Sequence, residues 1–130
     1  MNQDDAIRAV RTPGAPAAIG PYSQGVAAGG LLFVSGQLPL DPQTGEFVAG
    51  EIEAKTHRCL KNIAAIAQAA GTGLDRAVKL TVFLTDLANF ARVNQVYGQY
   101  FKAVLPARSA VQVAALPKGA EIEIEAILKF

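Results

Sequence analysis

Apolar side chains recur along this chain with two different periods. Between residues 51 and 70, apolar positions follow one another at steps of three and four, and polar side chains fall on the other side. The apolar positions are Leu60, Ile63, Ala67 and Ala70, and the polar positions are His57, Lys61 and Gln68. This spacing predicts an amphipathic helix over 51–70, ended by Gly71.

The next segment alternates with a period of two. Residues 78–85 read VKLTVFLT, which places an apolar side chain at every second position and a further one, Phe83, on the opposite face. We therefore predict a well-buried strand. Helical spacing returns over 90–104 and Pro106 prevents its continuation, so a second helix is expected after this strand.

Four more segments have the composition of strands. Residues 31–38, LLFVSGQL, are apolar and β-prone, and a strand over 24–28 is expected before them. Residues 109–115 and 121–128 flank the sequence LPKG, whose proline and glycine favour a chain reversal. The C-terminal part is therefore predicted to form a β-hairpin.

The order of these elements predicts the architecture. Strands, a helix, a strand, a helix and two final strands are typical of an α+β two-layer sandwich, in which two helices cover one face of a sheet. Phe83 and Ile127 would then point to the uncovered face. Because a small chain has little else to cover such side chains, we expect this face to pack against other subunits.

Composition narrows the range of partners. With 130 residues, 51% hydrophobic and 18% charged, the chain fits one domain over residues 1–130. Twelve Lys and Arg against eleven Asp and Glu give a formal net charge of +1. That balance supplies no general positive field, which disfavours nucleic acid and an anionic membrane as partners.

The sequence also bears on location. The N-terminal stretch opens polar and acidic and lacks the basic start and apolar run of a secretory signal. The longest apolar runs, at 31–34 and 64–67, are far shorter than a membrane span. We expect a cytoplasmic protein.

Metal and cofactor chemistry find no support in the residue pattern. One cysteine, Cys59, and one histidine, His57, are too few for a zinc site and allow no intramolecular disulfide. Positions i and i+2 of a helix point in different directions, so this pair is not a catalytic dyad. We expect His57 on the solvated side and Cys59 as a buried filler, with no metal and no cofactor.

Arg108 is the most informative polar residue. It follows Pro106 at the entrance of a predicted strand, and its planar guanidinium suits a carboxylate. A structural ion pair is an equally good interpretation of the pattern, because three glutamates share one face of the neighbouring predicted strand. These are Glu121, Glu123 and Glu125, and their spacing does not choose among them.

Five motifs together resemble the RidA family, also called YjgF/YER057c/UK114. They cover most of the chain in the family's order and are AIGPYSQ at 18–24, SGQLPLDPQTGE at 35–46, VKLTVFLTDL at 78–87, FARVNQVYGQYF at 90–101, and PARSAVQVAALPKGAEIEIEAI at 106–127. The resemblance implies a chorismate-mutase-like α+β fold with a mixed sheet, assembled as a homotrimer with active sites in clefts between subunits.

The same resemblance implies an activity. Family members hydrolyse reactive 2-imino and 2-enamino acids, such as the 2-aminoacrylate released by pyridoxal-phosphate-dependent dehydratases, to 2-oxo acids and ammonia. The implied enzyme is a 2-iminobutanoate/2-iminopropanoate deaminase that needs no metal or cofactor. Arg108 matches the family arginine that grips the substrate carboxylate, and Glu123 matches the glutamate near the attacking water.

Four further positions match the family's cleft. Tyr22 and Asn94, which the pattern alone would assign to loop packing and to a helix surface, match cleft residues. Gly36 and Ala110 match positions that contact the ligand through their backbones. Many relatives carry cysteine at the position of Ala110, a departure without consequence if only its main-chain carbonyl acts.

Two alternative functions remain open from the sequence. The first is a ligand-binding or chaperone-like protein that uses the same carboxylate cleft without turnover. The second is an endoribonuclease that inhibits translation, an activity attributed to some relatives. The presence of both Arg108 and Glu123 favours the deaminase over the first, and the near-neutral charge disfavours the second.

Overall fold

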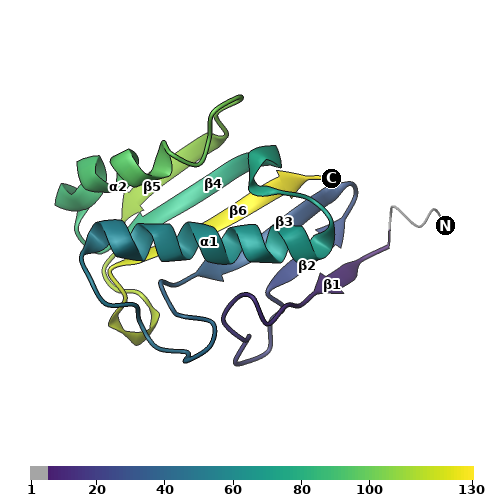
Figure 1. The fold of residues 1–130 in the computed structure, drawn as a ribbon, viewed down its shortest axis with the longest axis horizontal. Coiled ribbons are helices and arrows are strands. Elements are labelled where there is room, and N and C mark those ends of the chain that lie inside the picture. The colour runs from purple at the N-terminus through teal and green to yellow at the C-terminus, as the bar shows by residue number, and fades with distance from the viewer. Residues whose placement is uncertain (1–5) are drawn as a thin grey trace.

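A six-stranded sheet carries two α-helices on one of its faces (Figure 1). The computed structural model describes residues 6–130, so the acidic opening at 1–5 lies outside it. The strands are β1 (Arg8–Val10), β2 (Gly25–Ala28), β3 (Leu31–Gln37), β4 (Ala77–Leu84), β5 (Ala107–Gln112) and β6 (Ile122–Lys129). The helices are α1 (Ile52–Ala70) and α2 (Phe90–Tyr97), with short 3-10 turns at η2 (Leu74–Arg76), η3 (Leu87–Asn89) and η4 (Pro117–Gly119). The predicted α+β two-layer sandwich is confirmed.

The strand order is β1-β2-β3-β6-β4-β5, and only β4 and β5 run parallel. The sheet is therefore mixed, as the family resemblance implies. The predicted C-terminal hairpin is wrong, because β6 inserts between β3 and β4 and never pairs with β5. The LPKG turn is present, but the strand that follows it, β6, pairs with β4 and not with β5. A parallel pair needs a crossover connection, and here α2 supplies it.

Both predicted helices exist, and their ends follow local chemistry. Gly71 ends α1 with a φ of 98°, a left-handed conformation that glycine adopts without strain. The second helix ends at Tyr97, well before the predicted limit of residue 104, and turns fill the segment up to Pro106. The edge strand β1 has only three residues, too few for a periodic signal, and the sequence pattern did not predict it.

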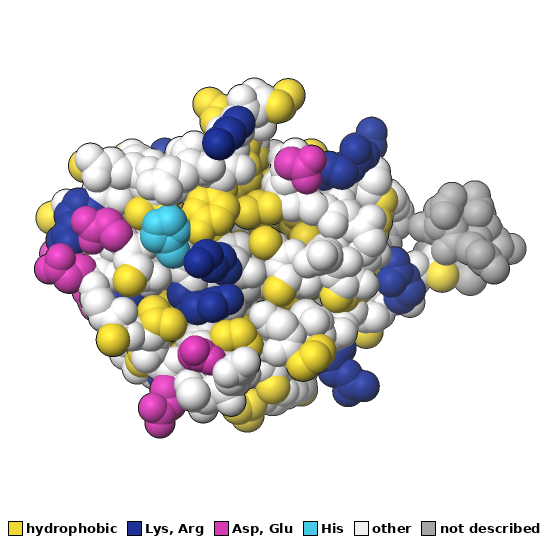
Figure 2. All heavy atoms as spheres, in the orientation of Figure 1, with side chains coloured by type: hydrophobic (Ala, Val, Ile, Leu, Met, Phe, Trp, Pro, Cys, Tyr) yellow, Lys and Arg dark blue, Asp and Glu magenta, His cyan; other side chains and the backbone are white. Residues whose placement is uncertain are grey.

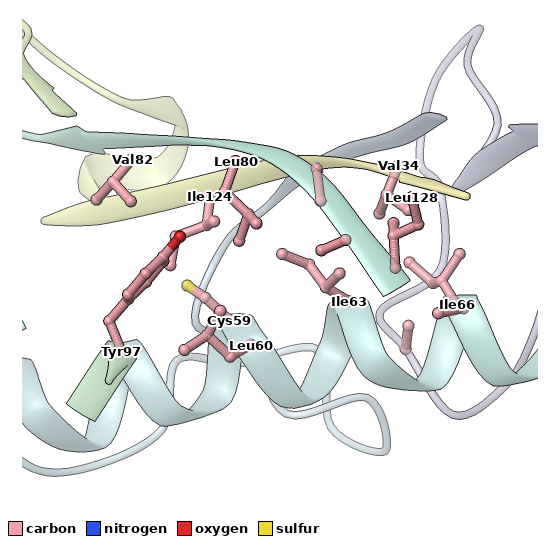
Figure 3. Close-up of a cluster of buried hydrophobic side chains, with 14 of the residues drawn as sticks. Val34, Cys59, Leu60, Ile63, Ile66, Leu80, Val82, Tyr97, Ile124 and Leu128 are labelled. Atoms are coloured by element: carbon pink, nitrogen blue, oxygen red, sulfur yellow. The ribbon is translucent and has the colours of Figure 1, made fainter. Parts of the chain in front are cut away.

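The core lies between the helices and the sheet (Figure 3). The apolar stripe predicted for α1 is buried, and alternate side chains of β4 and β6 meet it from the sheet. The largest fully buried side chains are Leu32, Leu60, Ile63, Ile66, Leu80, Leu84, Ile122, Ile124 and Leu128. Truncating one of these leucines to alanine typically costs about 2–5 kcal/mol of stability.

The opposite face of the sheet has no covering layer within the described chain. The strand register sets Phe33 beside Ile127 and Phe83 beside Val111. Phe33 is 43% exposed and Val111 is 42% exposed, so apolar side chains do gather on this face, as predicted. Among residues 6–130, no helix is both long enough and apolar enough to span a bilayer. The cytoplasmic location stays a prediction.

Candidate functional site

Three of the candidate residues meet at the edge strand β5, beneath α2. The Nη1 group of Arg108 donates a hydrogen bond of 2.7 Å to Oδ1 of Asn94. Ala110 lies two residues further along β5, on the same side of the strand, and packs against the core. We call Asn94, Arg108 and Ala110 the arginine half-site.

The structure does not support the structural ion pair as an interpretation of Arg108. Within residues 6–130 the ion pairs join Lys55 to Glu121, and Arg92 to Glu51 and Glu53. Arg108 belongs to none of them. The reason is topological, because β4 separates β5 from the strand that carries the glutamates.

The other three candidates border a cavity of about 620 Å³. Tyr22 comes from the loop before β2 and is 53% exposed, Gly36 from the end of β3, and Glu123 from the start of β6. We call Tyr22, Gly36 and Glu123 the glutamate half-site. Two of the lining residues from the LPKG turn, Pro117 and Lys118, were not predicted by the sequence.

A bulge in β3 brings Gly36 against Glu123. The register with β6 shifts between Val34 and Gln37, so two residues of β3 oppose one of β6. A Cβ placed on Gly36 would lie 2.7 Å from Cδ of Glu123 and 3.0 Å from its Oε2. Only glycine leaves room for this carboxyl group at its present position.

The environment of Glu123 changes its acidity. Burial raises the pKa of this carboxyl above its ordinary value, and the negative charge of Glu125 raises it further. No cation pairs with Glu123 within the described chain. A carboxyl group with a raised pKa is a better proton carrier near neutral pH than an ordinary surface glutamate.

The two half-sites point to opposite faces of the sheet. Arg108 lies opposite Leu80, which is fully buried under the helices, so Arg108 faces the helix side. Glu123 lies between Ile122 and Ile124, which are both buried under the helices, so it faces the other side. No residue of the arginine half-site lines the 620 Å³ cavity. One small ligand therefore cannot contact both half-sites of a single chain.

Two buried amide side chains hold the loops that surround the glutamate half-site. Gln24 accepts a hydrogen bond of 2.7 Å from the backbone of Thr12 and donates one of 2.8 Å to the carbonyl of Pro16. Asn62, on the buried side of α1, donates to the carbonyls of Leu38 and Leu40. Neither role was predicted, although a polar amide among apolar core positions is a signal that could have shown it.

His57 and Cys59 lie on different sides of α1, as predicted. Nδ1 of His57 is hydrogen-bonded to the hydroxyl of Tyr100 at 2.7 Å, outside the core. Cys59 is fully buried, and burial raises the pKa of its thiol well above the ordinary value, which disfavours a nucleophilic thiolate. Within residues 6–130, no group of three or more His, Cys, Asp or Glu side chains is placed to hold a metal ion.

The helix-covered face is electrostatically mixed. Figure 2 shows Lys and Arg side chains distributed among Asp and Glu side chains on this face, with the one histidine near α1. No broad field of one sign appears in this view, which agrees with the net charge of +1. This face therefore offers no continuous basic track for a phosphate backbone.

Known proteins share much of this sequence and this fold. RutC family protein y4sK of Sinorhizobium fredii is 54% identical over 122 residues, which cover 94% of this chain and 97% of that protein. Human 2-iminobutanoate/2-iminopropanoate deaminase is 48% identical over 120 residues, covering 92% and 88%. The crystal structure of E. coli TdcF with bound serine superposes with a TM-score of 0.90 at 47% identity, covering 95% of this chain and 98% of TdcF.

The fold and the site define a class of α+β domain in which two helices cover a mixed sheet and loops border a ligand-sized cavity. A family model described as Endoribonuclease L-PSP matches residues 12–129. The chain belongs to this family, which is the YjgF/RidA family that its sequence motifs resemble.

Proposed function

We propose that this protein is a 2-iminobutanoate/2-iminopropanoate deaminase that hydrolyses reactive 2-imino and 2-enamino acids to 2-oxo acids and ammonia. The observation that carries the proposal is the pairing of a prearranged arginine with a glutamate of raised pKa, in a chain about half identical to deaminases of three mammals. The arginine suits a carboxylate, and the glutamate suits proton transfer.

The active site in this proposal is formed by two copies of the chain. Arg108 and Glu123 face opposite sides of one sheet, so a ligand that needs both must take them from different subunits. The exposed apolar face around Phe33 and Val111 supports a closed oligomer that would bury it. We propose a homotrimer, the assembly that the family resemblance implies, with one site at each contact between subunits.

The chemistry needs positioning and one proton carrier. Arg108 binds the carboxylate of the iminium substrate and so fixes the carbon to be attacked. Glu123, as a carboxylate, accepts a proton while a water oxygen bonds to that carbon, which gives a carbinolamine. The protonated Glu123 then delivers the proton to nitrogen. As the C–N bond breaks, Glu123 takes the hydroxyl proton of the carbinolamine, which becomes the 2-oxo acid, and it passes this proton to the departing ammonia, which leaves as ammonium. One iminium ion and one water give one ketone and one ammonium ion, so the step balances.

The remaining cleft residues have supporting roles in this proposal. Gly36 keeps the space into which the Glu123 carboxyl projects. Tyr22 lines the cavity, and Asn94 holds Arg108. Ala110 would act through its backbone, so its methyl side chain in place of a thiol leaves the mechanism unchanged. The binding of serine by TdcF supports a carboxylate-binding cleft in this fold.

A cleft that binds carboxylates without turnover is the main alternative, and an endoribonuclease, the activity named in the family's description, is the second. A direct assay separates them. A threonine dehydratase generates 2-iminobutanoate in situ, and 2-oxobutanoate formation is followed with and without this protein. We expect clear acceleration of 2-oxobutanoate formation; binding of 2-oxobutanoate without acceleration would support the ligand-binding alternative, and cleavage of a single-stranded RNA would support the nuclease.

The proposed homotrimer can be tested by its mass in solution. Light scattering of the protein at micromolar concentration should give three times the mass of one chain. A monomer mass would contradict the proposed site, because a single chain keeps its half-sites on opposite faces of the sheet.

A further inference from the structure

Two aromatic rings of α2 contact the guanidinium of Arg108. Its central carbon lies 4.7 Å from the ring centroid of Tyr97 and 5.2 Å from that of Phe90, both within the range of cation–π attraction. Phe90 and Tyr97 are seven residues apart, roughly 10 Å along a helix axis, so the guanidinium fits between the rings. The rings therefore restrict movement of the guanidinium on two sides.

The third constraint on Arg108 comes from Asn94, which lies between these aromatic residues on the same face of α2. Its Oδ1 accepts the hydrogen bond from Nη1, and the Nε and Nη2 groups have no hydrogen-bond partner within residues 6–130. The N–H groups of Nε and Nη2 are parallel, so that edge of a guanidinium matches the two oxygens of a carboxylate.

We propose that Phe90 and Tyr97 are positioning residues that, together with Asn94, hold Arg108 with its Nε–Nη2 edge presented to the substrate carboxylate. This inference rests on the proposed function, because it assigns the orientation of the substrate at the same arginine. The rings act on the substrate only through Arg108. They keep the guanidinium in its binding orientation before the ligand arrives, which lowers the entropic cost of binding.

The hydroxyl of Tyr97 provides a matched control. It is buried and has no hydrogen-bond partner within the described part of the chain, residues 6–130, and Figure 3 shows it directed from α2 toward the sheet near Val82 and Ile124. The ring is also packed against Phe101, with centroids 4.8 Å apart. Removing the hydroxyl therefore leaves the ring beside Arg108, and losing an unsatisfied polar group should not destabilise the fold.

The experiment compares Tyr97→Phe, which keeps the ring, with Tyr97→Leu and Phe90→Leu, which remove one ring each. Phe90 is only half buried, so its variant tests the inference even if Tyr97→Leu fails to fold. Turnover of 2-iminobutanoate is measured as separate kcat and KM values. We expect the two leucine variants to raise KM about tenfold. Tyr97→Phe should stay within about twofold of wild type, as expected when only an unpaired hydroxyl is lost.

A second readout does not depend on turnover. In nuclear magnetic resonance spectra of the ligand-free protein, the Nε–Hε signal of Arg108, assigned by its loss in Arg108→Lys, should be sharp in wild type and Tyr97→Phe. Loss of a ring should broaden it, because the Nε–Hε proton then exchanges faster with solvent. Unchanged KM and an unchanged signal in a folded leucine variant would overturn the inference, as would lower kcat at constant KM, the result of a purely structural role. A wild type with a sharp signal but no turnover would reject the proposed function alone.

Discussion

In the arginine half-site the key side chain is held by its own chain, whereas in the glutamate half-site the key side chain has no ion-pair partner among residues 6–130. Arg108 is hydrogen-bonded to Asn94 and lies against two aromatic rings. Glu123 projects beside a glycine, close to the like charge of Glu125, and its carboxyl has a raised pKa. The group proposed to bind the carboxylate is thus held in place by its own chain, while the group proposed to transfer a proton has surroundings that disfavour its negative charge.

Removing the arginine should have the largest effect on activity. Arg108→Ala removes the donors of the two charge-assisted hydrogen bonds proposed to hold the substrate carboxylate, so we expect turnover to fall about 100-fold or more. Arg108→Lys keeps the charge but loses the two parallel donors, so it should also be severely impaired. Turnover, oligomer mass and melting temperature are measured for all three proteins. Retained turnover in a folded Arg108→Ala oligomer would reject the assignment.

Removing the proposed proton carrier, Glu123, should have the second-largest effect on activity. Glu123→Gln should lower kcat by about 10²-fold or more, the usual contribution of a general base or acid. Wild-type turnover should rise with pH as Glu123 ionises, above the ordinary range for a glutamate because its pKa is raised. A kcat that is unchanged in the glutamine variant would contradict the role.

The same variant, Glu123→Gln, tests through protein stability whether the folded state disfavours the negative charge of Glu123. A raised pKa means that the folded state disfavours the ionised form, so wild-type stability falls as pH rises past the ordinary pKa of glutamate. Glu123→Gln should therefore melt no lower than wild type at pH 8, and this advantage should disappear near pH 4. A glutamine variant that melts well below wild type at pH 8 would show that the carboxylate stabilises the fold.

A single methyl group should disturb the glutamate half-site selectively. Gly36→Ala places a Cβ 2.7 Å from Cδ of Glu123, so the carboxyl must move and turnover should fall about tenfold to 100-fold. Gly98→Ala is the matched control, since its φ is −62° and its Cβ would meet its nearest neighbour at 3.4 Å. Equal activity of the two variants would mean that Gly36 has no special role.

Chelation should have no effect. The structure places no cluster of metal-binding side chains within residues 6–130, and neither half-site needs a metal for its proposed step. Turnover measured before and after treatment with excess EDTA should be equal. Activity that is lost in the chelator and restored by zinc would overturn the mechanism.

The sequence predicted those parts of the fold that depend on local pattern. The sequence shows the helical spacing of apolar residues in α1 and their alternation in β4, because each element buries one face. The pairing of β5 with β4 was missed, since a parallel pair joins residues distant in sequence and the LPKG turn favoured a local hairpin. Contacts between β-strands that are not neighbours in sequence have no signature in a single periodic segment.

The sequence likewise predicted only part of the candidate site. Family motifs identified Arg108 and Glu123, but residue spacing did not show that they face opposite sides of the sheet, because that depends on the register across three strands. For Phe90 and Tyr97, the sequence pattern predicted only that they lie within the helix expected over 90–104. Their contact with Arg108 depends on how α2 lies over β5, which the sequence pattern does not specify.

Mixing two inactive variants tests most directly whether the two half-sites join across subunits. Arg108→Ala and Glu123→Gln chains are unfolded together in equal amounts, refolded into mixed oligomers and assayed for imine hydrolysis. If each site takes its arginine from one copy and its glutamate from the next, random assembly restores about one quarter of the wild-type sites in any closed ring. Each variant refolded alone should stay inactive, and refolded wild type sets the full scale. Mixed oligomers with no more activity than the separate variants would contradict a site shared between subunits.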